Sequence, residues 1–264
     1  ESVQCCVTSP PYWGLRDYDH PAQIGAEPSP VLYVENLVLI FREVRRVLCK
    51  DGTLWLNVGD GYARNGGTGH CGPNAIVGNT RKLIQKRNCK VPDCWGLKDR
   101  DLIGLPWRVA FALQEDGWVL RSKITCIKKT AMPESVKNRP THATEEVFLF
   151  SKSPTYFYDP NGFRETSGAN LRNYWVLGPD PGVSGHPATF PRELAQRCIL
   201  LGSREGDTVL DPFSGSGTTG LAAGELGRKA ILIELNPTYA QISRNRLTIY
   251  QPQLKLYTPR GKRV

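Results

Sequence analysis

The sequence lacks any long apolar run. No stretch of about 18 apolar residues, the length that would indicate a membrane-spanning helix, occurs among its 264 residues. The first residues contain neither a basic segment nor an apolar core, so no secretory signal is indicated. Internal repeats and low-complexity segments are also missing. We therefore expect a soluble intracellular protein without a membrane partner.

A disulfide framework is not expected either. The chain has 8 cysteines but no secretory signal, and thiols in such proteins are normally reduced. The cysteines that lie in apolar stretches, and are expected in the core, are Cys5, Cys6, Cys126 and Cys198. A zinc site is the lesser alternative, because its short Cys-x4-Cys spacing is loose for a structural site. Its ligands would be His70, Cys71, Cys89 and Cys94. We predict free thiols and no metal.

Acidic residues are fewer than basic ones. Lys and Arg number 34 against 25 Asp and Glu, which gives a net charge of +9 and a pI of about 9.2. This balance suits a polyanionic partner such as nucleic acid. Basic side chains gather in residues 81–90, 121–129 and 260–263, where each either contacts phosphate or forms a solvated surface. The predicted contact residues are Arg81, Lys82, Lys86, Arg87, Lys128, Lys129, Lys137 and Arg139.

Hydrophobic periodicity predicts strands that alternate with helices. Strands are expected at residues 3–8, 53–58, 118–127, 208–210 and 230–234, with a hairpin formed by 146–151 and 155–158. Helices are expected at 31–48, 105–115, 190–201 and 218–226. This alternation indicates one α/β domain over residues 1–264, with a mainly parallel twisted sheet, helices on both faces and ligands at the carboxyl ends of the strands. Residues 60–100 and 159–185 lack periodicity and are predicted insertions.

The strongest local motif is a glycine-rich turn between a strand and a helix. It reads Asp211-Pro-Phe-Ser-Gly-Ser-Gly-Thr-Thr-Gly220. Gly215 and Gly217 permit close backbone approach, and the helix amino terminus offers amides to an anionic group. No Gly-Lys-Ser/Thr follows, so the motif is not a P-loop, whereas its glycine spacing also fits a nicotinamide or flavin cofactor. Glu234, at the end of the next strand, is placed to accept hydrogen bonds from ribose hydroxyls.

The second motif is Ser9-Pro10-Pro11-Tyr12, directly after the first strand. Two prolines exclude helix and ladder pairing, so the strand delivers a stiff loop at its carboxyl end. Alone, this motif is more typical of a proline-rich turn or a short ligand motif.

Together, the two motifs resemble those of the DNA amino-methyltransferases, which combine Ser/Asp/Asn-Pro-Pro-aromatic with a Phe-x-Gly-x-Gly cofactor loop. The catalytic motif precedes the cofactor loop, as in the circularly permuted beta class. Residues 53–59, 132–139, 145–153 and 186–191 resemble further segments of that family. The resemblance implies a Rossmann-like fold and S-adenosylmethionine as cofactor. The cofactor contacts that it implies are Asp211, Phe213, Ser214, Gly215, Ser216, Gly217, Thr218, Glu234, Pro187, Ala188 and Phe190.

The residue types in the first motif suit transfer to an exocyclic amino nitrogen. Such a nitrogen is a poor nucleophile because its lone pair is delocalised into the ring. Ser9 Oγ and the Pro10 carbonyl, held by a loop that Pro11 stiffens, are expected to accept the amino hydrogens and turn the lone pair toward the methyl sulfonium. Tyr12 is expected to stack on a base flipped out of a duplex.

Serine at the first position resembles the cytosine N4 enzymes more than the adenine N6 enzymes. We therefore predict a site-specific N4-cytosine DNA methyltransferase of a restriction-modification type. The alternatives are adenine N6 or RNA base methylation, and a nucleic-acid-binding protein without catalysis. The predicted partner is double-stranded DNA, the chain is a monomer or a homodimer, and the location is the cytoplasm or nucleoid for a bacterial or phage source and the nucleus for a eukaryotic one.

DNA contact is expected from the two insertions, in which Trp95, Arg164, Arg172, Asn173 and Trp175 are candidates to enter a groove. Beta-class relatives usually carry a Gly-Asp segment just upstream of the catalytic strand, and its acidic residue contacts the cofactor's adenine. The sequence begins after that position, so no residue is assigned to the adenine amino group.

Overall fold

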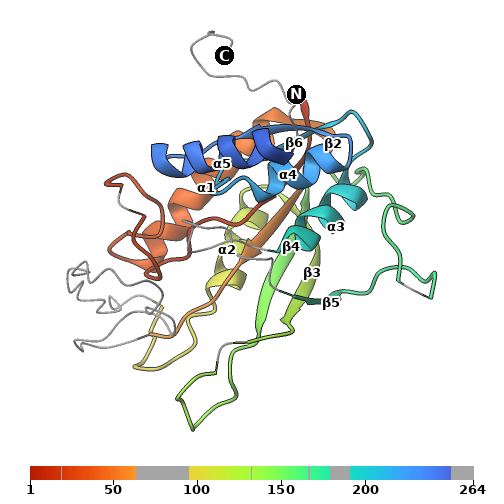
Figure 1. Ribbon diagram of the computed structural model, residues 1–264. Helices are drawn as coiled ribbons and strands as arrows, with labels where there is room; N and C mark the ends of the chain where they lie inside the picture. The colour runs from red at the N-terminus through yellow and green to blue at the C-terminus, as the bar shows by residue number, and fades with distance from the viewer. Residues whose placement is uncertain (19, 64–94, 132, 166, 179–190, 251–264) are drawn as a thin grey trace.

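The computed structural model describes residues 1–18, 20–63, 95–131, 133–165, 167–178 and 191–250. Its centre is a 7-stranded sheet with the strand order β5-β3-β4-β2-β1-β6-β7 (Figure 1). The strands are β1 (Val3–Thr8), β2 (Leu48–Val58), β3 (Val119–Lys128), β4 (Thr144–Ser151), β5 (Tyr174–Leu177), β6 (Thr208–Asp211) and β7 (Lys229–Leu232). The helices are α1 (Pro30–Val47), α2 (Leu105–Glu115), α3 (Arg192–Gly202), α4 (Thr218–Glu225) and α5 (Pro237–Tyr250).

Strand directions confirm the mainly parallel sheet. β1 pairs in parallel with β2 and β6, β6 with β7, and β3 with β5. β4 runs antiparallel between β2 and β3, so among the described strands it alone opposes the rest. The parallel strands therefore end at one common edge of the sheet, where open α/β folds place their ligands.

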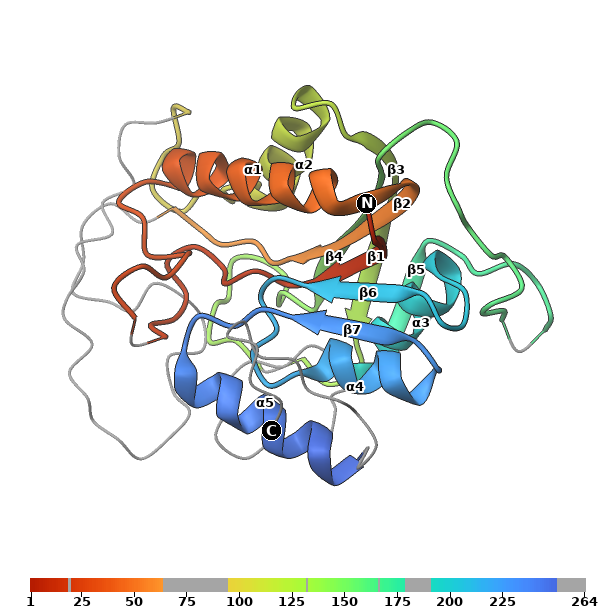
Figure 2. The same ribbon diagram turned by 90° about the horizontal axis from the view of Figure 1, so that it is seen from above.

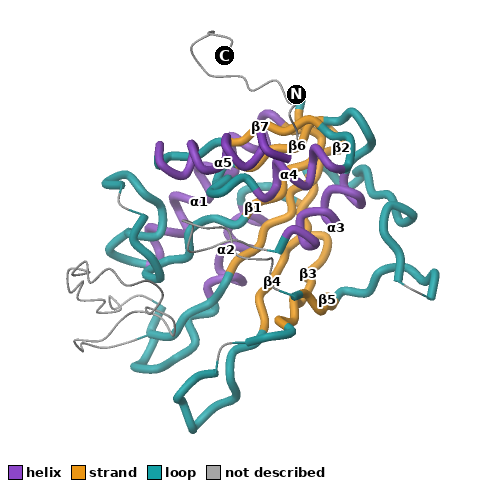
Figure 3. Tube along the Cα trace, in the orientation of Figure 1, coloured by secondary structure: helices purple, strands orange, loops and turns teal. Residues whose placement is uncertain are grey.

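Helices cover both faces of the sheet, as Figures 2 and 3 show. α1 and α2 lie on one face, and α3, α4 and α5 lie on the other. β1 is buried along its whole length because it lies in the middle of the sheet, and its successive side chains alternate between the two faces. Cys6 belongs to the core under α1, whereas Cys5 and Val7 belong to the core under α3 and α4.

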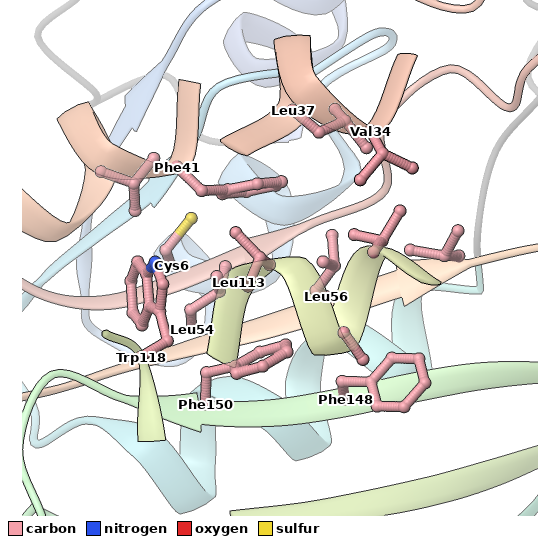
Figure 4. Close-up of a cluster of buried hydrophobic side chains, with 14 of the residues drawn as sticks. Cys6, Val34, Leu37, Phe41, Leu54, Leu56, Leu113, Trp118, Phe148 and Phe150 are labelled. Atoms are coloured by element: carbon pink, nitrogen blue, oxygen red, sulfur yellow. The ribbon is translucent and has the colours of Figure 1, made fainter. Parts of the chain in front are cut away.

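The core under α1 and α2 is built of large aromatic and aliphatic side chains (Figure 4). Phe41 from α1, Leu113 from α2, and Trp118, Phe148 and Phe150 from the strand side meet there and are almost completely buried. Burying each such side chain stabilises the fold by about 1.5–3 kcal/mol before conformational entropy is counted. This packing makes the sheet a rigid base for the loops at its carboxyl edge.

Local signals account for most element boundaries. Ser29 caps α1, since its Oγ accepts a hydrogen bond of 3.2 Å from the Leu32 amide, and Pro30 occupies the first turn. β1 and α2 coincide with the predicted ranges. The other predicted elements agree to within about two residues where the structure describes them, apart from β2, which begins at Leu48 rather than at residue 53, and the proposed hairpin.

The predicted hairpin is wrong. Residues 155–158 form no strand, and β4 instead pairs with β2 and β3. Periodicity missed α5 and the short strand β5, which lies inside the predicted insertion 159–185. Trp175, expected to enter a DNA groove, is 2% exposed and stacks on Trp55 at 6.3 Å between ring centroids. Its environment is a core rather than a surface.

Candidate active site

One cavity of about 940 Å³ opens at the carboxyl edge of the sheet. The four residues of the first motif, Ser9 to Tyr12, line it together with the glycine-rich loop from Pro212 to Ser216 and with Glu234. Motifs about 200 residues apart in the chain thus meet in one space. The volume lies in the usual range for a small-molecule site.

The loop between β6 and α4 owes its shape to glycine. Gly215 and Gly217 adopt φ values of 51° and 80°, in the left-handed region that favours glycine. Gly217 precedes α4 directly, and a Cβ added there would lie 2.3 Å from Ser243 Oγ on α5. Both the backbone conformation and the available space therefore require glycine at position 217.

Asp211 does not line the cavity; it is buried at the end of β6 and supports the loop from the protein interior. Its carboxylate is completely buried and accepts hydrogen bonds from Thr8 Oγ1 at 2.6 Å, Thr219 Oγ1 at 2.7 Å and the Phe213 amide at 3.0 Å. Burial raises the pKa of Asp211 to about 6, although the two hydroxyl hydrogen bonds oppose the shift. The carboxylate links the end of β1 to the glycine-rich loop, so it holds the two motifs together.

Glu234 lies in the cavity wall, two residues beyond β7. Its carboxylate accepts hydrogen bonds from the Gly215 amide at 2.7 Å and the Asn236 amide at 2.9 Å. A carboxylate has about four acceptor positions, so capacity remains for the hydroxyls of a ribose. The cradle of glycines with a carboxylate beside it therefore fits a nucleoside cofactor.

Side chains behind the Ser9-Pro-Pro-Tyr loop hold it in place. Tyr33 Oη in α1 donates a 3.0 Å hydrogen bond to the Pro11 carbonyl. Tyr12 packs against Gly59, where an added Cβ would lie 2.3 Å from Tyr12 Cε2. Burial, with the nearby Glu145 carboxylate, raises the pKa of Tyr12 well above its ordinary value, so its hydroxyl stays protonated.

Several polar residues of the cavity were not among the predicted site residues. Asn57 at the end of β2 and Glu145 at the start of β4 contact the Tyr12 hydroxyl at 3.1 and 3.3 Å. Asp60 and His142 also line the cavity, and burial raises the pKa of Asp60. The feature that could have identified these four residues is their position, since each lies at the carboxyl edge of the sheet.

Four of the predicted phosphate contacts, Lys128, Lys129, Lys137 and Arg139, lie toward this edge. Lys128 lines the cavity and its Nζ lies 2.5 Å from Glu145 Oε1. Lys129 and Lys137 are exposed. Arg139 pairs with Glu134 at 2.6 Å and stacks on Tyr62 at 4.0 Å from the ring centroid. Predicted residues outside the described part of the chain are Arg81, Lys82, Lys86, Arg87, Pro187, Ala188 and Phe190.

The second predicted insertion begins far from the cavity. β4 runs away from the site, and the Phe157 and Asp159 amides bond to carbonyls of Asp51 and Leu201 at the opposite edge (Figure 2). Arg164 and Arg172 lie in the loop that follows at that edge. This loop therefore does not contribute to the cavity.

The described residues contain no cluster of three or more potential metal ligands. The four residues of the alternative zinc site, His70, Cys71, Cys89 and Cys94, lie outside them. Cys5, Cys6, Cys126 and Cys198 are buried free thiols, as predicted. In the described part of the chain, no helix combines the length and apolarity that a bilayer crossing requires.

Comparison with known families gives the class of this fold and site. The model of the DNA methylase family of N6 and N4 methyltransferases matches residues 3–245, so the chain belongs to this family.

Two of its relatives are type II methyltransferases of bacteria. M.Cfr9I of Citrobacter freundii is 50% identical over 251 residues, which cover 93% of this chain and 81% of that protein. M.SmaI of Serratia marcescens is 46% identical over 253 residues, which cover 94% and 85%.

Solved structures confirm the Rossmann-like methyltransferase fold. The cytosine-N4-specific PvuII DNA methyltransferase superposes with a TM-score of 0.69 at 22% identity, covering 93% of this chain and 79% of its own. A putative DNA modification methylase of Thermus thermophilus, complexed with S-adenosyl-L-methionine, gives 0.65 at 26% identity, covering 100% and 92%.

Proposed function

We propose that this chain transfers a methyl group from S-adenosylmethionine to the N4 amino nitrogen of a cytosine flipped out of double-stranded DNA. One observation carries the proposal: the Ser9-Pro-Pro-Tyr loop and the glycine-rich loop line the same cavity. Serine rather than aspartate at position 9 supports cytosine as the target. The relatives named as type II methyltransferases support a site-specific modification enzyme.

The chain's own residues define what happens at each end of the cavity. Gly215, Gly217 and Glu234 hold the nucleoside of the cofactor, which supplies an electrophilic methyl group when bound. Ser9 Oγ and the Pro10 carbonyl accept the amino hydrogens, which favours a tetrahedral nitrogen with its lone pair aimed at that methyl group. Tyr12 stacks on the extruded base.

The positive surface beside the cavity positions the duplex. Lys129 and Lys137 are exposed at the edge where the base must enter, and they contact phosphates without reading sequence. The segment 60–100 supplies further contacts. Since the two relatives M.Cfr9I and M.SmaI come from bacteria, we propose a location in the bacterial cytoplasm or nucleoid.

The test identifies the methylated base directly. The chain is incubated with duplex DNA and methyl-labelled S-adenosylmethionine, and the digested nucleosides are analysed by mass spectrometry. N4-methylcytosine is the expected product. N6-methyladenine would overturn the target, and label in RNA but not in DNA would overturn the substrate. If the chain bound DNA but transferred no methyl group, it would be a DNA-binding protein without catalytic activity.

A further inference from the structure

Two hydroxyl groups connect the Ser9-Pro-Pro-Tyr loop to a carboxylate. Ser9 Oγ lies 3.5 Å from Tyr12 Oη, and Tyr12 Oη lies 3.3 Å from Glu145 Oε2. Asn57 Nδ2 contacts these three oxygens at 3.4, 3.1 and 3.2 Å, respectively, and so holds them together. All four residues line the cavity, so this row of hydrogen bonds begins at the cavity wall.

The direction of the hydrogen bonds follows from the carboxylate. A carboxylate accepts hydrogen bonds but cannot donate them, so the single hydrogen of the Tyr12 hydroxyl must point to Glu145. The Tyr12 oxygen then serves as an acceptor, and the Ser9 hydroxyl donates its own hydrogen to it. Ser9 is only half-buried, and after its contact with Asn57 its oxygen keeps one acceptor position. Every donor therefore points from Ser9 toward Glu145.

Methylation of an amino group has to release a proton. When the amino nitrogen attacks the methyl group, the C–S bond breaks with its electron pair on sulfur, and the new N–C bond leaves a positive charge on nitrogen. Such a charge, enclosed by protein, is costly unless it is neutralised. A serine hydroxyl passes a proton on but does not keep an extra one, so the proton must reach a stronger base.

We propose that Ser9, Tyr12 and Glu145 form a proton relay, with Glu145 as the final acceptor of the proton that the target amino group releases. The inference rests on the proposed methyl transfer. The nitrogen gives its proton to Ser9 Oγ, the Ser9 hydroxyl proton moves to Tyr12 Oη, and the Tyr12 proton moves to Glu145 Oε2. Each hydroxyl gains one proton and loses one, so the protein changes only at Glu145, which becomes a neutral carboxylic acid. Catalytic hydrogen bonds of this length in a free enzyme commonly tighten in the substrate complex.

The groups around Glu145 suit this role. Lys128 Nζ lies 2.5 Å from Oε1, the oxygen that the relay does not use, and its side chain is 44% exposed against 19% for Glu145. The ion pair thus lies between the relay and solvent, where the proton leaves. Burial raises the pKa of Tyr12 well above its ordinary value, so Tyr12 transmits a proton rather than losing one. Cys126, opposite Glu145 in β3, has a pKa raised to about 12 by burial and stays a thiol.

A double-mutant cycle tests whether the groups act in series. Tyr12→Phe keeps the ring and removes the middle hydroxyl, whereas Glu145→Gln keeps the shape and removes the final acceptor. Each should lower the single-turnover rate of methyl transfer to duplex DNA about 100-fold. The double variant should also be about 100-fold slower, rather than about 10,000-fold, because a relay that is already interrupted loses nothing more.

Glu146 offers a matched control. It follows Glu145 in β4 and pairs with Lys123 at 2.9 Å, with an exposure of 21%. Its side chain lies on the other face of the sheet. Glu146→Gln therefore loses a similar ion pair without touching the relay, and its transfer rate should stay within about twofold of the wild type, alone or relative to Tyr12→Phe when the two are combined.

The pH dependence of the transfer rate separates a proton acceptor from a group that only supports the loop. The wild-type rate should fall at low pH, where Glu145 is already protonated, and Glu145→Gln should lose this part of the profile. Asp60 and His142, the other titratable groups in this half of the cavity, are present in both proteins and serve as the internal reference.

Calorimetric cofactor affinity is measured on the same preparations and should be unchanged in every variant. Single variants as fast as the wild type would overturn the relay, as would multiplied losses in the double variant or an unaltered pH profile in Glu145→Gln. Loss of cofactor affinity in the single variants would also overturn it, because it would show a purely structural role. A wild type that transfers no methyl group fails the proposed function instead, whatever the variants do.

Discussion

The two halves of the cavity are built in different ways. The half that we propose to hold the cofactor, here called the cofactor half, is the contiguous loop 211–218 with the Glu234 carboxylate, which accepts a hydrogen bond from the Gly215 amide. The base half, formed by residues 9–12, Asn57 and Glu145, is assembled from side chains of separate segments. A local motif is therefore enough to specify the first half, whereas the second depends on how the sheet brings distant strands together.

The sharpest way to break the cofactor half is Gly217→Val. A β-branched side chain at φ 80° is strained, and its Cβ would lie 2.3 Å from Ser243 Oγ. Strain and clash together should weaken S-adenosylmethionine binding roughly 1,000-fold, measured by calorimetry.

Gly206→Val is the matched control for that substitution. Gly206 has a φ of 81°, but an added Cβ there meets nothing within 4 Å. It should lose stability through strain alone and keep its cofactor affinity. Equal loss of affinity in both variants would show that the clash with α5 does not shape the cofactor loop.

The stability of the protein should depend on pH through Asp211, whose carboxylate joins the two halves of the cavity. Burial raises the pKa of Asp211 from 3.8 to about 6, so the folded protein holds this proton more tightly than the unfolded chain. The contribution of this group to stability should therefore fall as the pH rises from about 4 to 6 and stay level above that. The total is on the order of 3 kcal/mol, since one pKa unit corresponds to about 1.4 kcal/mol.

Chemical denaturation across this pH range, in wild type and Asp211→Asn, isolates that contribution. The variant cannot titrate at position 211, so the stability of the wild type relative to the variant should fall as the pH rises from about 4 to 6. Parallel curves would contradict the assignment of this pH dependence to Asp211.

The base half should be sensitive to Gly59→Ala. A Cβ at Gly59 would lie 2.3 Å from Tyr12 Cε2, so the ring must move away from its position in the cavity. We expect kcat/KM for duplex DNA to fall about 30-fold, because misplacing a positioning group by a fraction of an ångström is costly. Cofactor affinity should be unchanged.

Gly61→Ala, two residues further on, controls for the loss of glycine in this segment. The nearest atom to an added Cβ there is Ile103 Cδ1 at 3.8 Å, an ordinary contact. Its kcat/KM should match the wild type. If Gly59→Ala were equally active, the packing of Tyr12 on position 59 would have no role in catalysis.

The smallest effects should come from the charged rim. Lys129→Gln and Lys137→Gln should each weaken DNA binding about threefold and reduce the slope of log K against log salt by about one. Lys50, which is exposed at the opposite edge of the sheet, supplies the control Lys50→Gln. Fluorescence anisotropy at several salt concentrations measures all three. A Lys50→Gln variant that loses as much affinity would show a diffuse effect of charge.

The same contrast explains what could be predicted from the sequence. The cofactor loop and the Ser9-Pro-Pro-Tyr loop were evident because each is a short motif at the end of a predicted strand. Asn57 and Glu145 were not evident, because β4 inserts antiparallel between β2 and β3 and brings Glu145 beside Asn57. The hydrophobic alternation of a segment predicts a strand, but it does not predict which strand will pair with it.

The hairpin prediction failed for a related reason. Residues 146–151 have the alternation of a strand, but the nearest apolar stretch in sequence, 155–158, is not its partner. The Phe157 amide instead bonds to the Asp51 carbonyl near the start of β2. β5 was missed because its four residues lie inside the aperiodic stretch 159–185, whereas the equally short β6 and β7 each follow a predicted helix. Tertiary pairing decided both outcomes.

The central claim is that one half of the cavity binds the cofactor while the other activates the base. Ser9→Ala tests it most directly, by calorimetric titration of S-adenosylmethionine and single-turnover methyl transfer to duplex DNA on the same sample. The account predicts a cofactor affinity within about twofold of the wild type and a transfer rate lowered at least about 100-fold. An unchanged transfer rate, or a parallel loss of cofactor affinity, would contradict it.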